Sequence, residues 1–307
     1  MCDHCKMFRI RLITTTSTLL KHYYQLSLAR QGWRPCFGDI DCYLQLDPTG
    51  MYVGALNDKP IATYSAIKYA DGYRHLGSYI VKEEYQKLGY GLNLEEACLA
   101  NSAPIKNMSL YTTPEMVRKA EKRHAMISRW PVGIYDLNIS KALDKLREYN
   151  SDSCEVKHIN EINMQDVCDY DTDVFGYNRI KFLEKWLNTP GAHVRVAVNK
   201  EGSIVGYVAV RLAFFQDEGY KLGPLFCENI EVGKALLKGV FEDVRECGLS
   251  TSHSAILDSP IGKNLDAKEL MQLVDGKCLG HIEFMTTNGL PKGRFNQWFA
   301  ITSPVCG

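Results

Sequence analysis

The sequence predicts an α+β protein with a mixed α/β sheet, arranged as two tandem domains that each hold a mostly antiparallel, twisted sheet flanked by helices. Two observations support this fold class. The chain has 307 residues, of which 45% are hydrophobic and 23% charged, so it is long enough for two domains of ordinary size. The order of strand, turn and helix signals in the first half returns in the second at a distance of roughly 145 residues, which is the size of a domain.

Three short strands separated by turn signals open each copy. In the first copy they lie in DPTGMYVGALNDKPIATYSAIKYADGYRHLGSYIV, residues 47–81, and in the second in PGAHVRVAVNKEGSIVGYVAVRLAFFQDEGYKLGPLF, residues 190–226. The match extends to single residues at both turns and beyond them, namely Asn57 and Asn199, Gly72 and Gly219, Tyr73 and Tyr220, and Gly77 and Gly223. The repeat therefore predicts the same sheet twice.

An amphipathic helix and a further strand follow in each copy. The further strands end in LYTTP, residues 110–114, and in ILDSP, residues 256–260, each with a proline where the strand must stop. Other helices are predicted over the basic run 117–129, over 264–274, and from a start within DYDTDVFGYN, residues 169–178. The polar segment 146–156 predicts a linker between a first domain, residues 1–145, and a second domain, residues 157–307.

The two copies differ where a helix begins after the third strand. The first copy has QKLGYG, residues 86–91, whereas the second has CENIEVGKALLKGV, with Glu228 and Glu231 and no paired glycines. The first turn of a helix offers unpaired N–H groups and a positive dipole end, and glycines let a ligand approach the backbone. The first copy therefore predicts an anion-binding loop that the second lacks. The spacing matches neither the GxxxxGK[ST] nor the GxGxxG pattern, which argues against nucleoside triphosphates and dinucleotides.

This loop, between the strand GSYIV and a helix, resembles the acyl-CoA pyrophosphate loop of the GNAT superfamily of N-acetyltransferases. Segments 32–69, 174–192 and 219–226 are similar to a tandem GNAT group whose second domain lacks the loop, and the resemblance covers roughly residues 10–303. It implies that the strand backbone holds the pantetheine arm while the loop cradles the pyrophosphate. The implied cofactor-binding residues are Tyr79, Ile80, Val81, Gln86, Lys87, Leu88, Gly89, Tyr90, Gly91 and Leu92.

The resemblance implies transfer of acetyl from acetyl-CoA to a primary amine by direct attack in a ternary complex. Such transfer needs a neutral amine, an N–H donor for the developing oxyanion and a proton for the departing thiolate. The backbone N–H of Val81 or its neighbour is the expected oxyanion donor. His75 aligns with a glutamate of some family members and is the expected base, the alternative being an exposed hairpin histidine. Glu83 and Glu84 are second candidates for the base.

Two further residues complete the expected site. The helix that begins at PEMVRKAEKRHAM lacks the tyrosine that often acts as the acid in this family, so Tyr111, at the end of the preceding strand, is the nearest acid. Asp258 matches an aspartate that recurs at this strand end in the family, which places it on the acceptor side. The alternative for Asp258 is a turn or N-cap residue before the helix at 264–274.

An N-acetyltransferase with acetyl-CoA as cosubstrate is thus the expected function, and a catalytically inactive acyl-CoA-binding or sensing protein is the alternative. Lys and Arg together equal Asp and Glu at 36 each, so no net field favours nucleic acid or a membrane. The expected acceptor is an amine on a small molecule, a peptide or a protein lysine, and the oligomeric state stays open. Scattered cysteines, 11 in number, and the absence of a long apolar run indicate the cytoplasm, with the nucleus as a further option. Cys2 and Cys5 lack two matching ligands, so no metal is expected.

Overall fold

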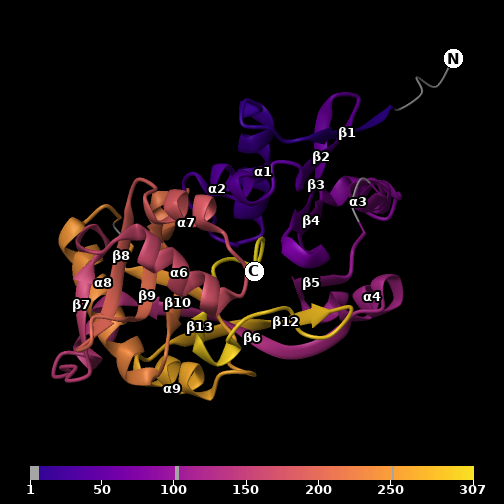
Figure 1. Cartoon of the computed structure of the whole chain (residues 1–307). Helices are drawn as coiled ribbons and strands as arrows, with labels where there is room; N and C mark the ends of the chain where they lie inside the picture. Colours follow the sequence, from indigo (N-terminus) through magenta and orange to yellow (C-terminus); the bar gives the residue numbers. More distant parts are fainter. Residues whose placement is uncertain (1–6, 101–103, 251) are drawn as a thin grey trace, which may run out of the picture.

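The computed structural model describes residues 7–100, 104–250 and 252–307, which together form one continuous mixed sheet flanked by helices (Figure 1). The strands are β1 (Phe8–Leu12), β2 (Met51–Leu56), β3 (Lys59–Lys68), β4 (Tyr73–Val81), β5 (Asn107–Thr112), β6 (Ile127–Asn138), β7 (Cys154–His158), β8 (Ala192–Asn199), β9 (Ile204–Leu212), β10 (Tyr220–Cys227), β11 (Ser254–Ser259), β12 (Lys277–Thr286) and β13 (Trp298–Ala300). The helices are α1 (Thr18–Arg30), α2 (Asp39–Leu46), α3 (Tyr90–Ala100), α4 (Pro114–His124), α5 (Ile139–Lys145), α6 (Met164–Phe175), α7 (Ile180–Leu187), α8 (Ile230–Cys247) and α9 (Leu265–Leu273). The predicted fold class is confirmed, because the strands pair antiparallel except for β4 with β5 and β10 with β11.

Both predicted strand triplets form, as β2–β3–β4 and as β8–β9–β10. The turn between β2 and β3 consists of Asn57 and Asp58, whose φ angles are 47° and 64°. Positive φ at both positions is what a two-residue type I′ hairpin requires, and Asn and Asp tolerate it better than most residues. The local turn chemistry that was visible in the sequence therefore sets this hairpin.

The two halves exchange strands at the centre of the sheet. The strand order is β1-β2-β3-β4-β5-β12-β6-β11-β10-β9-β8-β7, so β12 of the second half pairs with β5, and β6 of the first half pairs with β11. These two strands also pair with each other from Asp136–Lys277 to Ile127–Thr286, and Figure 1 shows them side by side below the rest of the first half. Each half therefore completes its sheet with a strand from the other. The segment 146–156 connects α5 to β7, and its role as a domain boundary stays a prediction.

A buried ion pair joins the halves away from the sheet centre. Arg211 of β9 donates to Asp39 of α2 at 2.5 Å, and both side chains are at most 5% exposed. Its guanidinium also donates to Thr189 and to the Phe37 carbonyl and lies 3.6 Å from the ring centroid of Trp186. The charge of Arg211 is thus fully partnered, as a buried ion must be for the fold to tolerate it.

Two predicted helices have other boundaries in the structure. Residues 169–175 are the end of α6, not a helix start, and Gly176 terminates this helix with a φ of 95°. The basic helix α4 ends at His124, where Ala125 adopts a left-handed conformation with a φ of 52°, and Ile127 and Arg129 belong to β6. The predicted start within 169–178 is therefore wrong, whereas the predicted helix over 117–129 is correct as far as His124, where a left-handed residue ends it.

Neither a membrane span nor a metal cluster is found in the part of the chain that the structure describes. No described helix is long and apolar enough to cross a bilayer. No three His, Cys, Asp or Glu side chains within the described ranges gather closely enough to hold a metal ion. Cys2 and Cys5 lie outside the described residues.

Candidate functional site

A gap between β4 and β5 opens into a cavity that residues of both halves line. These strands pair only from Tyr73–Asn107 to Leu76–Leu110, and beyond that point each continues without the other, β4 to Val81 and β5 to Thr112. The diverging ends border a cavity of about 740 Å³. Pockets of this volume are typical of sites that bind drug-sized molecules or cofactors.

The cavity passes through the sheet and reaches both of its faces. On one face Tyr79 and Val81 line it and pack with the apolar cluster beneath α3 and α4. On the other face Ile80 and Tyr111 line it and pack with the cluster that includes α1 and α2. A ligand that lies between β4 and β5 can therefore be approached from opposite faces by two groups.

A bulge in β4 lies on the cavity wall at Ser78. Its φ of 53° is positive, and the register with β3 shifts between Thr63 and Ser65 at this point. The hydroxyls of Ser78, Ser65 and Tyr24 are buried, the Tyr24 hydroxyl interacts with both serines, and of the three residues only Ser78 lines the cavity. Bulges next to binding sites change the direction of a strand edge, so the bulge at Ser78 redirects β4 where it borders the cavity. Ser78 could not be singled out from the sequence, because serine is unremarkable in a strand.

The predicted anion loop lies at the mouth of this cavity, directly before α3. The helix begins at Tyr90. Its first hydrogen bond runs from the Asn93 N–H to the carbonyl of Gly89, the residue just before the helix, at 3.0 Å. The N–H groups of Tyr90, Gly91 and Leu92 therefore have no partner within the helix and point toward its N-terminal end. The Gln86 side chain donates to the Val81 carbonyl at 2.9 Å, which fixes the loop to the end of β4.

The two glycines of the loop have different physical roles. Gly89 has a φ of 86°, and a Cβ placed on it would meet nothing within 4 Å. It is therefore required by backbone conformation. A Cβ on Gly91 would lie 2.5 Å from the Tyr79 hydroxyl and 2.9 Å from a methyl of Val81, so Gly91 allows close packing of α3 on β4. Lys87, also with a positive φ of 61°, lines the cavity beside them.

A buried charged network lies on the α3–α4 face of the cavity. Glu95 of α3 is ion-paired with Arg123 of α4 and lies 3.0 Å from His124 Nε2 at the end of α4. The Tyr64 hydroxyl donates to the same carboxylate at 3.4 Å. Lys119 also lines the cavity from α4. This face therefore carries positive charge next to the N-terminus of α3, and the sequence did not indicate Glu95 because its partners come from distant segments.

His75, the expected base, is fully buried and is not among the residues that line the cavity. Its Nε2 lies 3.0 Å from the Pro304 carbonyl, which can only accept, so Nε2 carries the proton and Nδ1 accepts from Ser109 Oγ at 2.8 Å. Burial lowers the pKa of His75 to about 4. The hydrogen bond to the Pro304 carbonyl opposes this lowering but is the smaller effect. The alternative of an exposed hairpin histidine is wrong, and the geometry makes His75 a support beneath Tyr111, whose ring centroid is 5.3 Å away.

The other expected catalytic residues fall in two groups. Tyr111 lines the cavity, and burial raises its pKa well above the ordinary value, with Tyr73 the next cause. It is therefore a neutral phenol that can donate a proton. Glu83 and Glu84 lie in a short 3₁₀ turn, are exposed and do not line the cavity.

Asp258 lines the cavity from the second half of the chain. It belongs to β11, whereas the N-cap of α9 is Asn264, so the N-cap alternative for Asp258 is wrong. Lys221 of β10 donates to its carboxylate at 2.5 Å, and both residues are buried. The expected acceptor-side position is therefore occupied by an ion pair, not by a free carboxylate.

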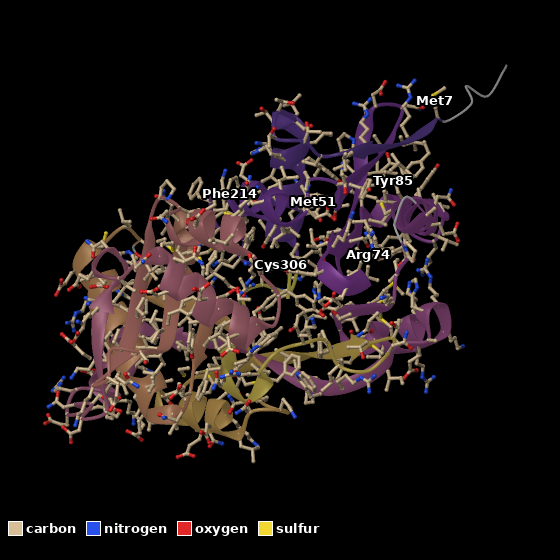
Figure 2. The ribbon with its side chains drawn as sticks, in the orientation of Figure 1. Met7, Met51, Arg74, Tyr85, Phe214 and Cys306 are labelled. Carbon is tan, nitrogen blue, oxygen red and sulfur yellow. The ribbon has the colours of Figure 1, made fainter. Side chains whose placement is uncertain are left out.

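The corresponding gap in the second half is filled by the chain itself. β10 and β11 pair only at Tyr220–Ala255 and Lys221–Ile256. Beyond these pairs β13 enters and pairs with β10 at Leu225–Ala300, while the Ile301 N–H donates to the Asp258 carbonyl. After β13 the chain continues into the space between the halves, where Figure 2 labels Cys306. The second half therefore offers no open gap between these strands.

Two family models match the chain, and their descriptions agree. The acetyltransferase (GNAT) family matches residues 16–119, and an acetyltransferase (GNAT) domain matches residues 167–275. Among curated proteins, holothin acyltransferase of Pseudoalteromonas sp. (strain SANK 73390) is 29% identical over 201 residues, covering 64% of this chain and 63% of that protein. An uncharacterized protein of Caenorhabditis elegans is 23% identical over 171 residues, covering 55% and 54%. The matched part of the chain thus spans less than two thirds of these relatives.

Two solved structures resemble this chain over more than nine tenths of its length. A putative acetyltransferase from Pyrococcus horikoshii has a TM-score of 0.69 at 17% identity, over 98% of this chain and 96% of its own. A tandem GNAT protein from the clavulanic acid biosynthesis pathway has a TM-score of 0.67 at 12% identity, over 93% and 100%. At such identities the likeness shows a common fold.

Proposed function

This chain belongs to the GNAT superfamily, with two GNAT domains in tandem, and on that premise we propose that it is an N-acetyltransferase that transfers acetyl from acetyl-CoA to a primary amine. Membership of the GNAT superfamily supports an acyl-transfer activity in general. The observation that carries the finer proposal is the cavity that passes through the sheet between β4 and β5, with the free N-terminus of α3 at its mouth. One ligand can then lie in the gap while a second reaches it from the other face.

The residues around the gap fit an acyl-CoA. The N–H groups of Tyr90, Gly91 and Leu92 and the nearby Lys87 suit a pyrophosphate, because a helix N-terminus and a cation both favour negative charge. The edge of β4 from Gly77 to Val81 faces the gap without a partner strand, so a pantetheine arm can extend the sheet there. When bound, acetyl-CoA supplies the activated acyl group.

The chain's own groups then have defined tasks at the centre of the gap. The backbone N–H of Val81 or its neighbour in β4 holds the developing oxyanion, and hydrogen bonds fixed in advance are the usual source of this stabilisation. Tyr111 holds a proton that the departing thiolate needs. His75 keeps the Tyr111 ring and the 303–307 segment in place from behind.

We propose a small-molecule amine as the acceptor, entering on the face that Asp258 borders. A relative named holothin acyltransferase supports an acyltransferase of this general kind, and the cavity wall made by both halves favours a compact acceptor over a protein lysine. Oligomeric state stays open, and the cytoplasm is the proposed location.

The proposal is tested by following thiol release from acetyl-CoA with a panel of small primary amines. We expect release to depend on the amine, and the Tyr111→Phe variant to lose about 10² to 10⁴ in kcat while it binds CoA as the unchanged protein does. CoA binding without thiol release for any amine would instead support an inactive acyl-CoA-binding protein.

A further inference from the structure

Most of the side chains on the acceptor side of the cavity are apolar. The apolar side chains on the α1–α2 face and from the second half are Trp33, Ile80, Tyr111, Ile134, Ile256 and Ile282, and the polar residues Gln31 and Asp258 lie beside them. Polar atoms that could hydrate a charged group are scarce in such a wall, and transfer of an ammonium into it is costly unless a carboxylate pairs with it. Whether the cavity can bind a positively charged acceptor therefore depends on whether a carboxylate on its wall is free to pair with the ammonium.

Both carboxylates among the described lining residues are already neutralised. Asp258, on the acceptor side, pairs with Lys221 at 2.5 Å, and the side chains are 4% and 10% exposed. Glu95, on the α3–α4 face, pairs with Arg123 and lies 3.0 Å from His124. An incoming ammonium would have to displace one of these partners.

No base faces the acceptor side within the described lining of the cavity. His75 lies off the wall, with its two ring nitrogens engaged by Ser109 and Pro304. His124 lines the cavity from the opposite face of the sheet and is engaged by Glu95. An ammonium that entered would therefore find no group placed to remove its proton.

We propose that the acceptor is a small amine without charge at neutral pH, in which the amino group is attached to an aromatic or heteroaromatic ring. This inference rests on the proposed N-acyltransferase function and specifies its substrate class. Such an amine keeps its lone pair free of a proton because the ring delocalises it, and its flat apolar body matches the Trp33 and isoleucine wall.

The proton balance of the reaction agrees with this acceptor. When a neutral amine attacks, the new C–N bond forms, the C–S bond breaks, and the nitrogen loses one proton while the sulfur gains one. Tyr111 can give its proton to the sulfur and be restored by the proton from nitrogen, so no external base is needed. An ammonium carries one proton more, which has to leave for solvent before attack.

The test compares two acceptors of the same ring size, aniline and cyclohexylamine, with acetyl-CoA and the full chain, corrected for the reaction without enzyme. At about pH 7 we expect kcat/KM for aniline to exceed that for cyclohexylamine by ~10-fold or more. Between about pH 7 and 9 the aniline value should stay flat and the cyclohexylamine value should rise with the fraction of neutral amine. Equal or better use of cyclohexylamine or of spermidine at about pH 7 overturns the inference.

A variant pair tests the role of the ion pair. Lys221→Met leaves the Asp258 carboxylate unpaired, so we expect the preference for aniline over cyclohexylamine to fall by ~10-fold. The double variant Lys221→Met with Asp258→Asn removes both charges and should restore the preference, and it remains informative where the single variant fails to fold. An unchanged preference in a folded Lys221→Met variant would contradict the role given to the pair.

Different results would contradict the proposed N-acyltransferase function and the proposed acceptor class. Acylation of aliphatic amines with aniline unused would leave the N-acyltransferase function intact and overturn the acceptor class. CoA binding, measured by calorimetry, with no acylation of any amine would overturn the proposed function and with it the inference.

Discussion

His75 shows how the environment of one side chain decides its chemistry. An imidazole beside Arg74 in a hairpin looks like a group that titrates near neutral pH, yet this one is fully buried and bonded on both sides. Its neutral form is the one that satisfies the Pro304 carbonyl and the Ser109 hydroxyl. The residue therefore stabilises the native state as a neutral hydrogen-bonding group.

The pH dependence of stability follows from this. The pKa of His75 is lowered in the folded protein from 6.5 to about 4, so the unfolded chain binds a proton in that interval and the folded chain does not. Stability from this group is present above about pH 6.5 and is lost as the pH falls toward 4, by about 3 kcal/mol in total. Urea titrations from pH 7 to 4 should show this loss, and His75→Gln should reduce its slope. An identical slope in the variant would show that other groups cause it.

The two loop glycines should respond differently to substitution. Gly89→Val puts a side chain into open space at positive φ, so we expect a cost of about 1–2 kcal/mol and weaker CoA binding by calorimetry. Gly91→Ala forces a contact with the Tyr79 hydroxyl and should cost about 1–3 kcal/mol in urea. Tyr79→Phe in the Gly91→Ala background should recover part of that stability. Unchanged CoA affinity in folded Gly89→Val would remove the loop from the cofactor site.

At the scale of the elements, β13 makes the two halves unequal. In the first half the gap between β4 and β5 stays open, whereas in the second half β13 pairs with β10 and the residue after it bonds to β11. An added Cβ at Gly223 of β10 would lie 2.4 Å from the Ile301 carbonyl, which shows how closely the inserted segment packs. A strand of the protein thus takes the place that a pantetheine arm has in the proposed site.

This difference predicts the stoichiometry of binding. Calorimetric titration with CoA should give one site per chain, because the second gap is filled and the first turn of helix α8 carries Glu231, a carboxylate that disfavours a pyrophosphate. Gly89→Val is the matched control, since it should weaken this single site. Two equivalent sites per chain would contradict the account of β13.

At the scale of the whole molecule, the exchange of β6 and β12 ties the halves into one folding unit. Each strand makes its main pairing outside the half that contains it in sequence, and Figure 1 shows both in the region where the halves meet. The buried pair of Arg211 and Asp39 adds a second connection. Neither half can therefore complete its sheet alone.

Two measurements follow at this scale. Urea unfolding followed by far-UV circular dichroism and by tryptophan fluorescence should give coincident single transitions, and separated transitions would show independent halves.

Asp39→Asn leaves Arg211 buried without its counter-charge and should lower the free energy of unfolding in urea by about 3–5 kcal/mol, whereas Arg211→Met with Asp39→Asn should recover much of that loss.

The sequence by itself determined most of the local elements, the duplication and the glycine-containing turn before α3. Turn residues such as Asn57 and Gly72, and Gly89 before α3, act through backbone conformation over a few residues, so their effect can be inferred without knowing what lies nearby. The tertiary structure alone decided the burial of His75, the pairing of Asp258 with Lys221, the network at Glu95 and the exchange of β6 with β12. These depend on contacts between segments far apart in the chain, and burial and pairing change the pKa and charge of a side chain in ways that its neighbours in sequence do not specify.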